Sequence, residues 1–450
     1  MKTLYRLSRT PILLLLLSLV VLASCSRQPS KEEIERRLTE YVRPLVENRE
    51  FSGVIRVERG GELLFEDAWG YADVEDEEPH TTGGHFSIAS VSKTLTAAAV
   101  VKLESEGEIS FDEPIGSYLP DFEYGEEITV RHLLRFESGL AEIESDRPLS
   151  SDELLDAIGS RPLEFEPGTE ERYGNSGFNV LAILVERVTL KPFGEYLREA
   201  FFEPLGMDDT GLRSELGDEE ETLVSPHRPG PPPELVLKAP YSNPFSAIGS
   251  GALYSTAEDL ARWGLAAARN EIIDFNRLRY PWGWGTTEIE GHQGLSQTGM
   301  HSGFTSSLQV FPEQDIVIVM LNNIEAGMWG DWAKDLARIV FGTSPLMEHE
   351  PYDYLESLPE DALSDYPGRY ALNRNRFVEI REESGNLWLH LNGVEIGHYL
   401  LPLEEGGYQL RDFTGRIYFN RSENGAVVSL TWELPEVWDA LDETYRRTGN

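Results

Sequence analysis

The 450-residue sequence predicts an α/β fold: a sheet flanked by helices, with a helical region inserted into it, followed by a small antiparallel β domain. Three observations predict it. Short β-type runs occur near both ends of the first 345 residues, and a long, mostly helical stretch separates them. A sheet built from both ends of a domain leaves the middle to form a second lobe beside a cleft. Beyond residue 351, β-type runs alternate with glycine and asparagine turns.

The first elements are a helix and a strand pair. Residues 31–48 have apolar side chains at helical spacing, on one side of the segment. Residues 52–59 and 62–68 are β-rich runs joined by Gly60-Gly61, which is typical of a hairpin. The apolar residues of the helix are Ile34, Leu38, Tyr41, Val42 and Leu45.

The helical middle and the second strand pair follow. We expect a helix over 90–106, ended by Gly107, because glycine favours the left-handed conformation that ends helices. Residues 255–258, Ser-Thr-Ala-Glu, predict a capping box for a helix over 259–268. The Pro-rich stretch 228–233 predicts an inserted loop. We further expect short helices and turns within 109–119 and 128–140, helices over 151–158, 175–188 and 329–341, and strands over 306–311 and 316–322.

The C-terminal part predicts a separate domain. Residues 342–351 mark a change in composition, so we divide the chain into a domain over 31–345 and a β-rich domain over 352–450, forming a small antiparallel sheet or barrel. His390 and His398 lack partners at metal-ligand spacing, and we expect neither a metal nor a cofactor. The predicted strands are 377–381, 387–391, 396–401, 408–410, 416–420 and 427–432.

The N-terminus predicts export. Residues 1–24 combine a basic start with an apolar run too short to span a membrane comfortably, which is typical of a signal peptide. The run ends in Leu-Ala-Ser-Cys, which resembles the lipobox of bacterial lipoproteins and implies cleavage before Cys25 and lipidation of its thiol. Residues 25–30 would form a lipidated tether to a membrane, on the periplasmic side or the cell surface. The alternative is an ordinary signal peptide with an incidental cysteine.

The charge excludes one class of partner. Lys and Arg number 39 against 78 Asp and Glu, for a formal net charge of −39. Such a surface repels phosphate backbones, so we expect no nucleic-acid partner.

A Ser-x-x-Lys motif supplies the first candidate catalytic residues. Ser90 and Lys93 lie three residues apart at the start of the predicted helix, and this spacing puts both side chains on one face. A serine hydroxyl needs a neighbouring base, and a lysine serves as one only when burial keeps its amine neutral. Backbone N–H groups at the same helix start suit a developing oxyanion.

Two further motifs accompany it. Tyr173 offers a phenolic oxygen that can relay a proton, and Asn175 offers an amide for a substrate peptide bond. The alternatives are a packing role for Tyr173 and a helix-cap role for Asn175. The segment Gln297, Thr298, Gly299 and Met300 precedes a predicted strand, and glycine at such an edge lets a substrate backbone approach closely.

In this order, the three motifs resemble those of the penicillin-recognising serine hydrolases, namely class C β-lactamases, related D-alanyl-D-alanine carboxypeptidases and related esterases. The resemblance covers roughly residues 31–341 and implies a β-lactamase/transpeptidase-like fold. It implies that Ser90 is acylated, that Lys93 is the base or orients it, that Tyr173 relays a proton and that Asn175 holds the substrate amide. The wall strand would contribute Gln297, Thr298 and Gly299, and the N–H groups of Ser90 and Met300 would form the oxyanion hole.

The sequence departs from this family at two points. Gln297 stands where relatives have Lys or His, so recognition of a substrate carboxylate is in question. Phe136-Glu137 replaces a His-Thr pair before Ser-Gly-Leu, and the sequence gives no functional account of this change.

These features predict a lipid-anchored serine hydrolase that forms an acyl-enzyme with a D-alanyl peptide, a β-lactam or a small ester or amide, with peptidoglycan as one source of substrate. The alternative is a non-catalytic lipoprotein that binds cell-wall peptides in the same cleft.

Overall fold

The computed structural model describes most of the chain beyond residue 27. Residues 1–24 and Cys25 lie outside the described residues, so the predicted signal peptide and lipidation site stay predictions. Among the residues that it describes, no helix is both long and apolar enough to cross a membrane. The described residues are 28–143, 145, 149–216, 223–233, 235–239, 247–271, 282–325, 329–359, 361–392, 397–411, 415–433 and 443–448.

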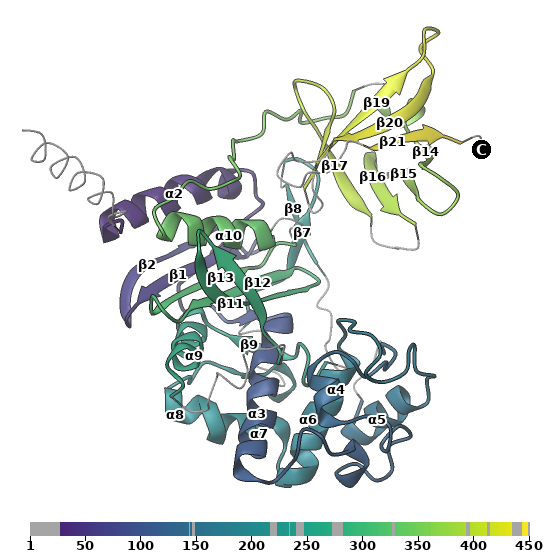
Figure 1. Cartoon of the computed structure of the whole chain (residues 1–450). Coiled ribbons are helices and arrows are strands. Elements are labelled where there is room, and N and C mark those ends of the chain that lie inside the picture. Colours follow the sequence, from purple (N-terminus) through teal and green to yellow (C-terminus); the bar gives the residue numbers. More distant parts are fainter. Residues whose placement is uncertain are drawn as a thin grey trace, which may run out of the picture.

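A six-stranded antiparallel sheet forms the centre of the first domain (Figure 1), in the order β10-β11-β12-β13-β1-β2. The pairing of β1 with β13 joins the two ends of the domain, with Gly53 opposite Asn322. The predicted sheet built from both ends is confirmed. Its strands are β1 (Gly53–Arg59), β2 (Glu62–Trp69), β10 (Gly285–Ile289), β11 (His292–His301), β12 (Phe304–Phe311) and β13 (Ile316–Asn322).

Helices cover both faces of this sheet. α2 (Lys31–Glu47) and α10 (Trp329–Val340) pack on one face, and α3 (Ser92–Glu106) and α9 (Ala257–Arg269) pack on the other. Strand β13 is buried along its whole length because its alternate side chains enter the two cores. Val317, Val319 and Leu321 belong to one core, and Ile316, Ile318 and Met320 to the other.

The capping box predicted at residues 255–258 is wrong by one residue. Thr256 is the N-cap of α9, and its side chain accepts the N–H of Asp259. Ser255 cannot serve, because it ends the short strand β9 (Leu253–Ser255) and pairs there with Phe86.

The inserted region is mostly helical and lies at the end of the molecule opposite the C-terminal domain (Figure 1). Its longest helix, α6 (Ser176–Thr189), packs against α3 and so supports the segment that follows Ser90. The other elements of the first domain are β3 (Tyr71–Asp73), β4 (Glu78–Pro79), β5 (Phe86–Ser87), η1 (Ala89–Val91), η2 (Ile115–Ser117), α4 (Val130–Leu134), α5 (Ser151–Gly159), α7 (Phe193–Leu197), η3 (Arg198–Phe202), α8 (Glu203–Leu205), β6 (Gly211–Leu212), η4 (Arg213–Glu215), β7 (His227–Pro229) and β8 (Val236–Lys238).

The C-terminal domain is a closed antiparallel barrel of eight strands, preceded by α11 (Ala362–Asp365). The sequence indicated six of them and missed the first and the last, which close the barrel by pairing Tyr370 with Arg447. The two missed strands bury mainly one tyrosine each, Tyr370 and Tyr445, and so lack a clear apolar alternation. The strands are β14 (Gly368–Ala371), β15 (Phe377–Glu383), β16 (Asn386–Leu391), β17 (His398–Pro402), β18 (Tyr408–Leu410), β19 (Arg416–Arg421), β20 (Val427–Glu433) and β21 (Glu443–Arg447).

The Pro-rich segment 228–233 connects the two domains. It begins within β7 and runs into the turn before β8, and this hairpin packs Leu235 against Trp388, Tyr399 and Leu401 of the barrel. Arg411, directly after β18, donates to the backbone carbonyl of Leu235 and to the carbonyls of residues 48 and 49. The predicted insertion is therefore part of the domain interface.

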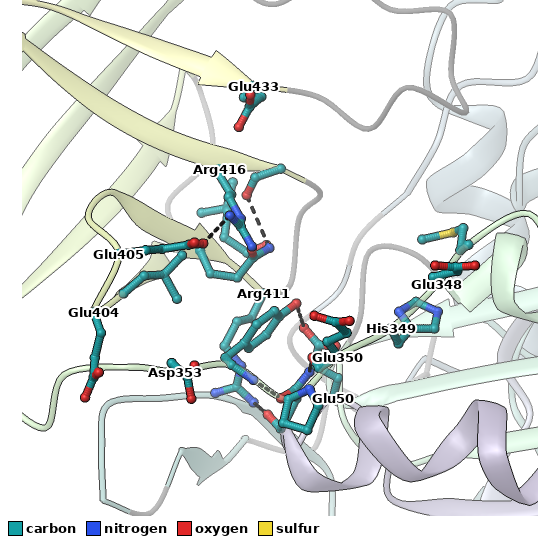
Figure 2. Close-up of a pocket in the computed structure, with 18 of the residues that line it drawn as sticks. Glu50, Glu348, His349, Glu350, Asp353, Glu404, Glu405, Arg411, Arg416 and Glu433 are labelled. Atoms are coloured by element: carbon teal, nitrogen blue, oxygen red, sulfur yellow. Dashed lines mark hydrogen bonds and ion pairs between the residues drawn. The ribbon is translucent and has the colours of Figure 1, made fainter.

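A cavity of about 910 Å³ lies at this interface (Figure 2). Glu50 lines it and is buried, and its carboxylate accepts a hydrogen bond of 2.8 Å from the hydroxyl of Tyr352. Burial raises the pKa of Glu50 to about 7, against the opposing effects of the Arg411 guanidinium and of hydrogen bonds from Tyr352 and Asn48.

This pKa makes stability depend on pH. Between pH 4.5, the ordinary value, and about 7, Glu50 stays protonated in the folded chain but ionises in the unfolded one. The free energy of unfolding therefore falls as pH rises through this window, by at most about 3 kcal/mol. Glu50→Gln cannot ionise, so its melting temperature should fall less between pH 5 and pH 8 than that of the wild type. Glu350→Gln, an exposed carboxylate on the same cavity, is the control, and an unchanged pH response in Glu50→Gln would contradict the prediction.

Candidate active site

Ser90 lies in a tight turn ahead of its helix. The 3₁₀ turn η1 runs into α3, so the α-helix begins at Ser92, two residues later than predicted. Ala89 has a left-handed φ of 45°, a conformation that costs energy for a residue with a side chain and that recurs at functional sites. Lys93 lies in the first helical turn, and its Nζ is 3.0 Å from Ser90 Oγ.

Lys93 is fully buried and its amine has three acceptors. Besides Ser90 Oγ, they are Asn175 Oδ1 at 2.8 Å and the backbone carbonyl of Ser250 at 2.9 Å. An ammonium has three N–H groups, whereas a neutral amine has two and a lone pair. The two fixed acceptors can hold the two N–H groups, so the lone pair of a neutral amine points at Ser90. Burial lowers the pKa of Lys93 to about 7, although the carboxylate of Glu142 opposes this shift.

Tyr173 reaches the same hydroxyl from the inserted region. Its hydroxyl donates to Ser90 Oγ over 2.7 Å, while its ring is half exposed. Burial around the phenol raises its pKa, so Tyr173 stays protonated at neutral pH. Phe136 packs against this ring, with 5.0 Å between ring centroids, and against Phe178. Phe136, whose role could not be explained from the sequence, thus supports the ring of Tyr173.

The side chain of Asn175 does not cap helix α6. It makes no cap hydrogen bond, and its Oδ1 accepts from Lys93 instead. The alternative of a cap role alone is therefore wrong. Glu142 takes that place, because its Oε1 accepts the backbone N–H groups of Asn175 at 2.8 Å and Ser176 at 3.3 Å.

One face of β11 packs against the loop that carries Ser90. Gln297 Nε2 donates to the carbonyl of Ser90 over 3.2 Å, and His301 Nε2 is hydrogen-bonded to Ser87 Oγ. Between them, a Cβ on Gly299 would lie 2.4 Å from the carbonyl oxygen of Ile88, so only glycine allows this approach. Gln297 lies beside Ser90, as expected, but its amide already binds the loop.

The same part of β11 has a free edge. β10 begins at Gly285, opposite Ser296, so no strand among the described residues pairs with the outer edge of residues 297–301. A two-residue turn closes the hairpin with β12 at His301 and Phe304. Since hydrogen-bonded pairs alternate from such a closing pair, the N–H of Met300 points away from β12, toward the free edge. Thr298 shares the face of Met300, whose side chain is half exposed.

Sequence reasoning missed several of these contacts. Asn179 Oδ1 accepts the N–H groups of residues 249 and 250 and so positions the carbonyl that binds Lys93. Ser306 Oγ donates to the carbonyl of Ile88 over 2.8 Å. Glu142 was not selected as a site residue either. None of these residues belongs to a local motif, because their partners are remote in sequence.

A buried lysine and a tyrosine that converge on one serine hydroxyl, beside a free strand edge, define a serine hydrolase. A family model described as Beta-lactamase matches residues 38–339, well over half of the chain. The chain belongs to the β-lactamase family.

Relatives within this family carry different names. The chain is 24% identical to penicillin-binding protein 4* of Bacillus subtilis (strain 168), over 90% of this chain and 97% of the relative. It is 35% identical to esterase EstB of Burkholderia gladioli, over 43% of this chain and 54% of the esterase. Its fold is similar to that of D-amino acid amidase from Ochrobactrum anthropi SV3, with a TM-score of 0.60 and 23% identity over 69% of this chain and 97% of the amidase.

Proposed function

We propose that this serine hydrolase cleaves a small ester or amide, including peptide amides, through an acyl-enzyme on Ser90. The observation that carries the proposal is the buried amine of Lys93, which two fixed acceptors orient toward Ser90 Oγ. With a pKa of about 7, a large fraction of this amine is neutral at physiological pH and can accept a proton.

The reaction follows from these positions. Ser90 Oγ attacks the substrate carbonyl while its proton moves to Lys93. The N–H groups of Ser90 and Met300 stabilise the oxyanion. Tyr173, a neutral phenol, gives a proton to the leaving alkoxide or amine and regains one from Lys93. Water then attacks the acyl carbonyl while one of its protons passes to the neutral amine of Lys93, and a proton from Lys93 returns to Ser90 Oγ as the Oγ–acyl bond breaks and the carboxylic acid leaves. Asn175 Nδ2 is positioned to donate to a substrate amide.

Labelling with a fluorophosphonate tests the proposal. We expect a single covalent adduct by intact mass, which peptide mapping assigns to Ser90, and turnover of neutral aryl esters. No adduct and no hydrolysis would refute catalysis. Binding of D-alanyl peptides without turnover would instead support the non-catalytic alternative.

Gln297 limits the substrate class. Relatives with a cation at this position can make a charge-assisted hydrogen bond, which is roughly twice as strong as the neutral bond that glutamine offers. We expect carboxylate-bearing penicillins to be poor substrates relative to neutral esters. Gln297→Lys should raise the ratio of kcat/KM for an anionic β-lactam over a neutral ester by about tenfold. An unchanged ratio would show that residue 297 only braces the loop at the carbonyl of Ser90.

We also propose that the mature chain is exported and lipid-anchored through Cys25, as its N-terminal sequence suggests. Protein expressed in a bacterial host should fractionate with membranes, and Cys25→Ser should release or mislocalise it. Cysteine occurs nowhere else in the chain, so the substitution affects no other thiol. A soluble wild-type protein with an unmodified N-terminus would contradict the anchor.

A further inference from the structure

Glu142 caps the start of α6, and its position also brings it close to the catalytic residues. Its Oε1 accepts two backbone N–H groups at the start of α6, and its carboxylate crosses the backbone between Tyr173 and Asn175. Gly174 makes this crossing possible, because a Cβ there would lie 2.5 Å from Glu142 Oε1. Both flanking side chains reach the catalytic group, one at Ser90 Oγ and the other at Lys93 Nζ.

The carboxylate is exposed and has no cationic partner among the described residues. Glu142 makes no ion pair there, and its Oε2 accepts no hydrogen bond. Arg172 lines the same small cavity, of about 50 Å³, but it pairs with Glu164 at 2.6 Å and with Glu170 at 3.2 Å. Lys93 already has three acceptors.

Residues 297–300 of the opposite wall carry no positive charge. Gln297 is neutral and donates to the loop, and the half-exposed side chain of Met300 is apolar. A substrate carboxylate near Ser90 would therefore meet the charge of Glu142, offset only by the partly protonated amine of Lys93, whereas an ammonium would be attracted to Glu142.

We propose that Glu142 binds an ammonium group of the substrate close to the carbonyl that Ser90 attacks, which makes esters or amides of α-amino acids the preferred acyl donors. The exposed ring of Tyr173 and the side chain of Met300 offer apolar contacts to the rest of such an acyl group. The inference rests on the proposed acyl-enzyme function and specifies its substrate class.

Two aryl esters, identical except for the amino group, test whether Glu142 binds an ammonium group. One is the phenylalanine ester, assayed as each enantiomer, and the other is the 3-phenylpropionyl ester. Each kcat/KM is divided by the rate constant of spontaneous hydrolysis, because an ammonium also activates its own ester. We compare one ratio: the normalised kcat/KM of the phenylalanine ester, for its faster enantiomer, divided by the normalised kcat/KM of the 3-phenylpropionyl ester. This ratio separates recognition of the amine from any change in acyl transfer itself.

Glu142→Gln keeps an oxygen for the two N–H groups of α6 but removes the charge. We expect the ratio to fall by about tenfold. Glu164→Gln removes a carboxylate from the same small cavity that is paired with Arg172, and we expect it to leave the ratio unchanged. An equal ratio in the wild type and in Glu142→Gln would overturn the inference.

The wild type alone provides a second test, should the variant not fold. An α-amino group has a pKa of about 7.7–8.0, so the normalised ratio should fall as pH rises from 6.5 to 9.5 and the substrate loses its charge. A flat ratio would also overturn the inference. If neither ester is hydrolysed and no adduct forms on Ser90, the proposed acyl-enzyme function fails; if the neutral ester is hydrolysed without a preference, only this inference fails.

Discussion

Ser90→Ala should lower kcat/KM for ester hydrolysis by at least about 10⁴-fold and abolish covalent labelling, because Ser90 Oγ is the hydroxyl to which both Lys93 and Tyr173 are hydrogen-bonded. The substitution removes one of the three acceptors of the Lys93 amine and leaves Asn175 Oδ1 and the carbonyl of Ser250. A neutral amine needs only those two acceptors, and the hydroxyl of the half-exposed Tyr173, which donates to Ser90 Oγ, can donate to water instead. We therefore expect the melting temperature to change little.

The control is Ser105→Ala, an exposed serine on the same helix with only a local hydrogen bond to the carbonyl of Lys102. It should keep full labelling and activity. Adduct formation that persists in Ser90→Ala would remove Ser90 as the nucleophile, whatever the melting temperature.

Lys93→Met should have the second-largest effect. Methionine has a similar length and suits a buried position, but it cannot accept the proton of Ser90. General base catalysis contributes about 10²–10⁴-fold, so we expect acylation to slow by that factor. Lys102→Met on the same helix, where the lysine pairs with Glu106, is the matched control.

The role of Lys93 as a base also predicts how the rate changes with pH. Only the neutral amine of Lys93 acts as a base, so wild-type kcat/KM for a neutral ester should rise with pH through about 7 and then level off. Lys93→Met should lose this rise. A profile that keeps the same inflection in the variant would show that another group, and not Lys93, is the base.

The sequence predicted what depends on neighbouring residues. The spacing of Ser90 and Lys93 brings their side chains together across η1 and the first turn of α3, and Gly60-Gly61 determines the hairpin between β1 and β2, so both could be predicted locally. The bond between Ser87 and His301 joins residues 214 positions apart, and no periodicity reports such a pair. Glu142 was missed for the same reason, since its partners begin 33 positions later.

The barrel shows a second limit of prediction from the sequence. Its strands with several buried residues were predicted, whereas β14 and β21 depend on each other and on one buried tyrosine each. The Pro-rich segment was predicted to be an inserted loop, but its role at the interface depends on aromatic side chains more than 150 residues later, such as Trp388.

The pairing of β1 with β13 also has a consequence for how the chain must fold. The N–H of Ser52 is bonded to the side chain of Asn322, 270 positions away. A ribosome adds about 5–20 residues per second, so the first hairpin exists for roughly 15–50 s before its partner strand has been made. Until then, one edge of β1 is unpaired and open to association with other chains. Folding of this domain is therefore expected to be slow, to follow synthesis rather than accompany it, and to depend on chaperones that keep early strands apart.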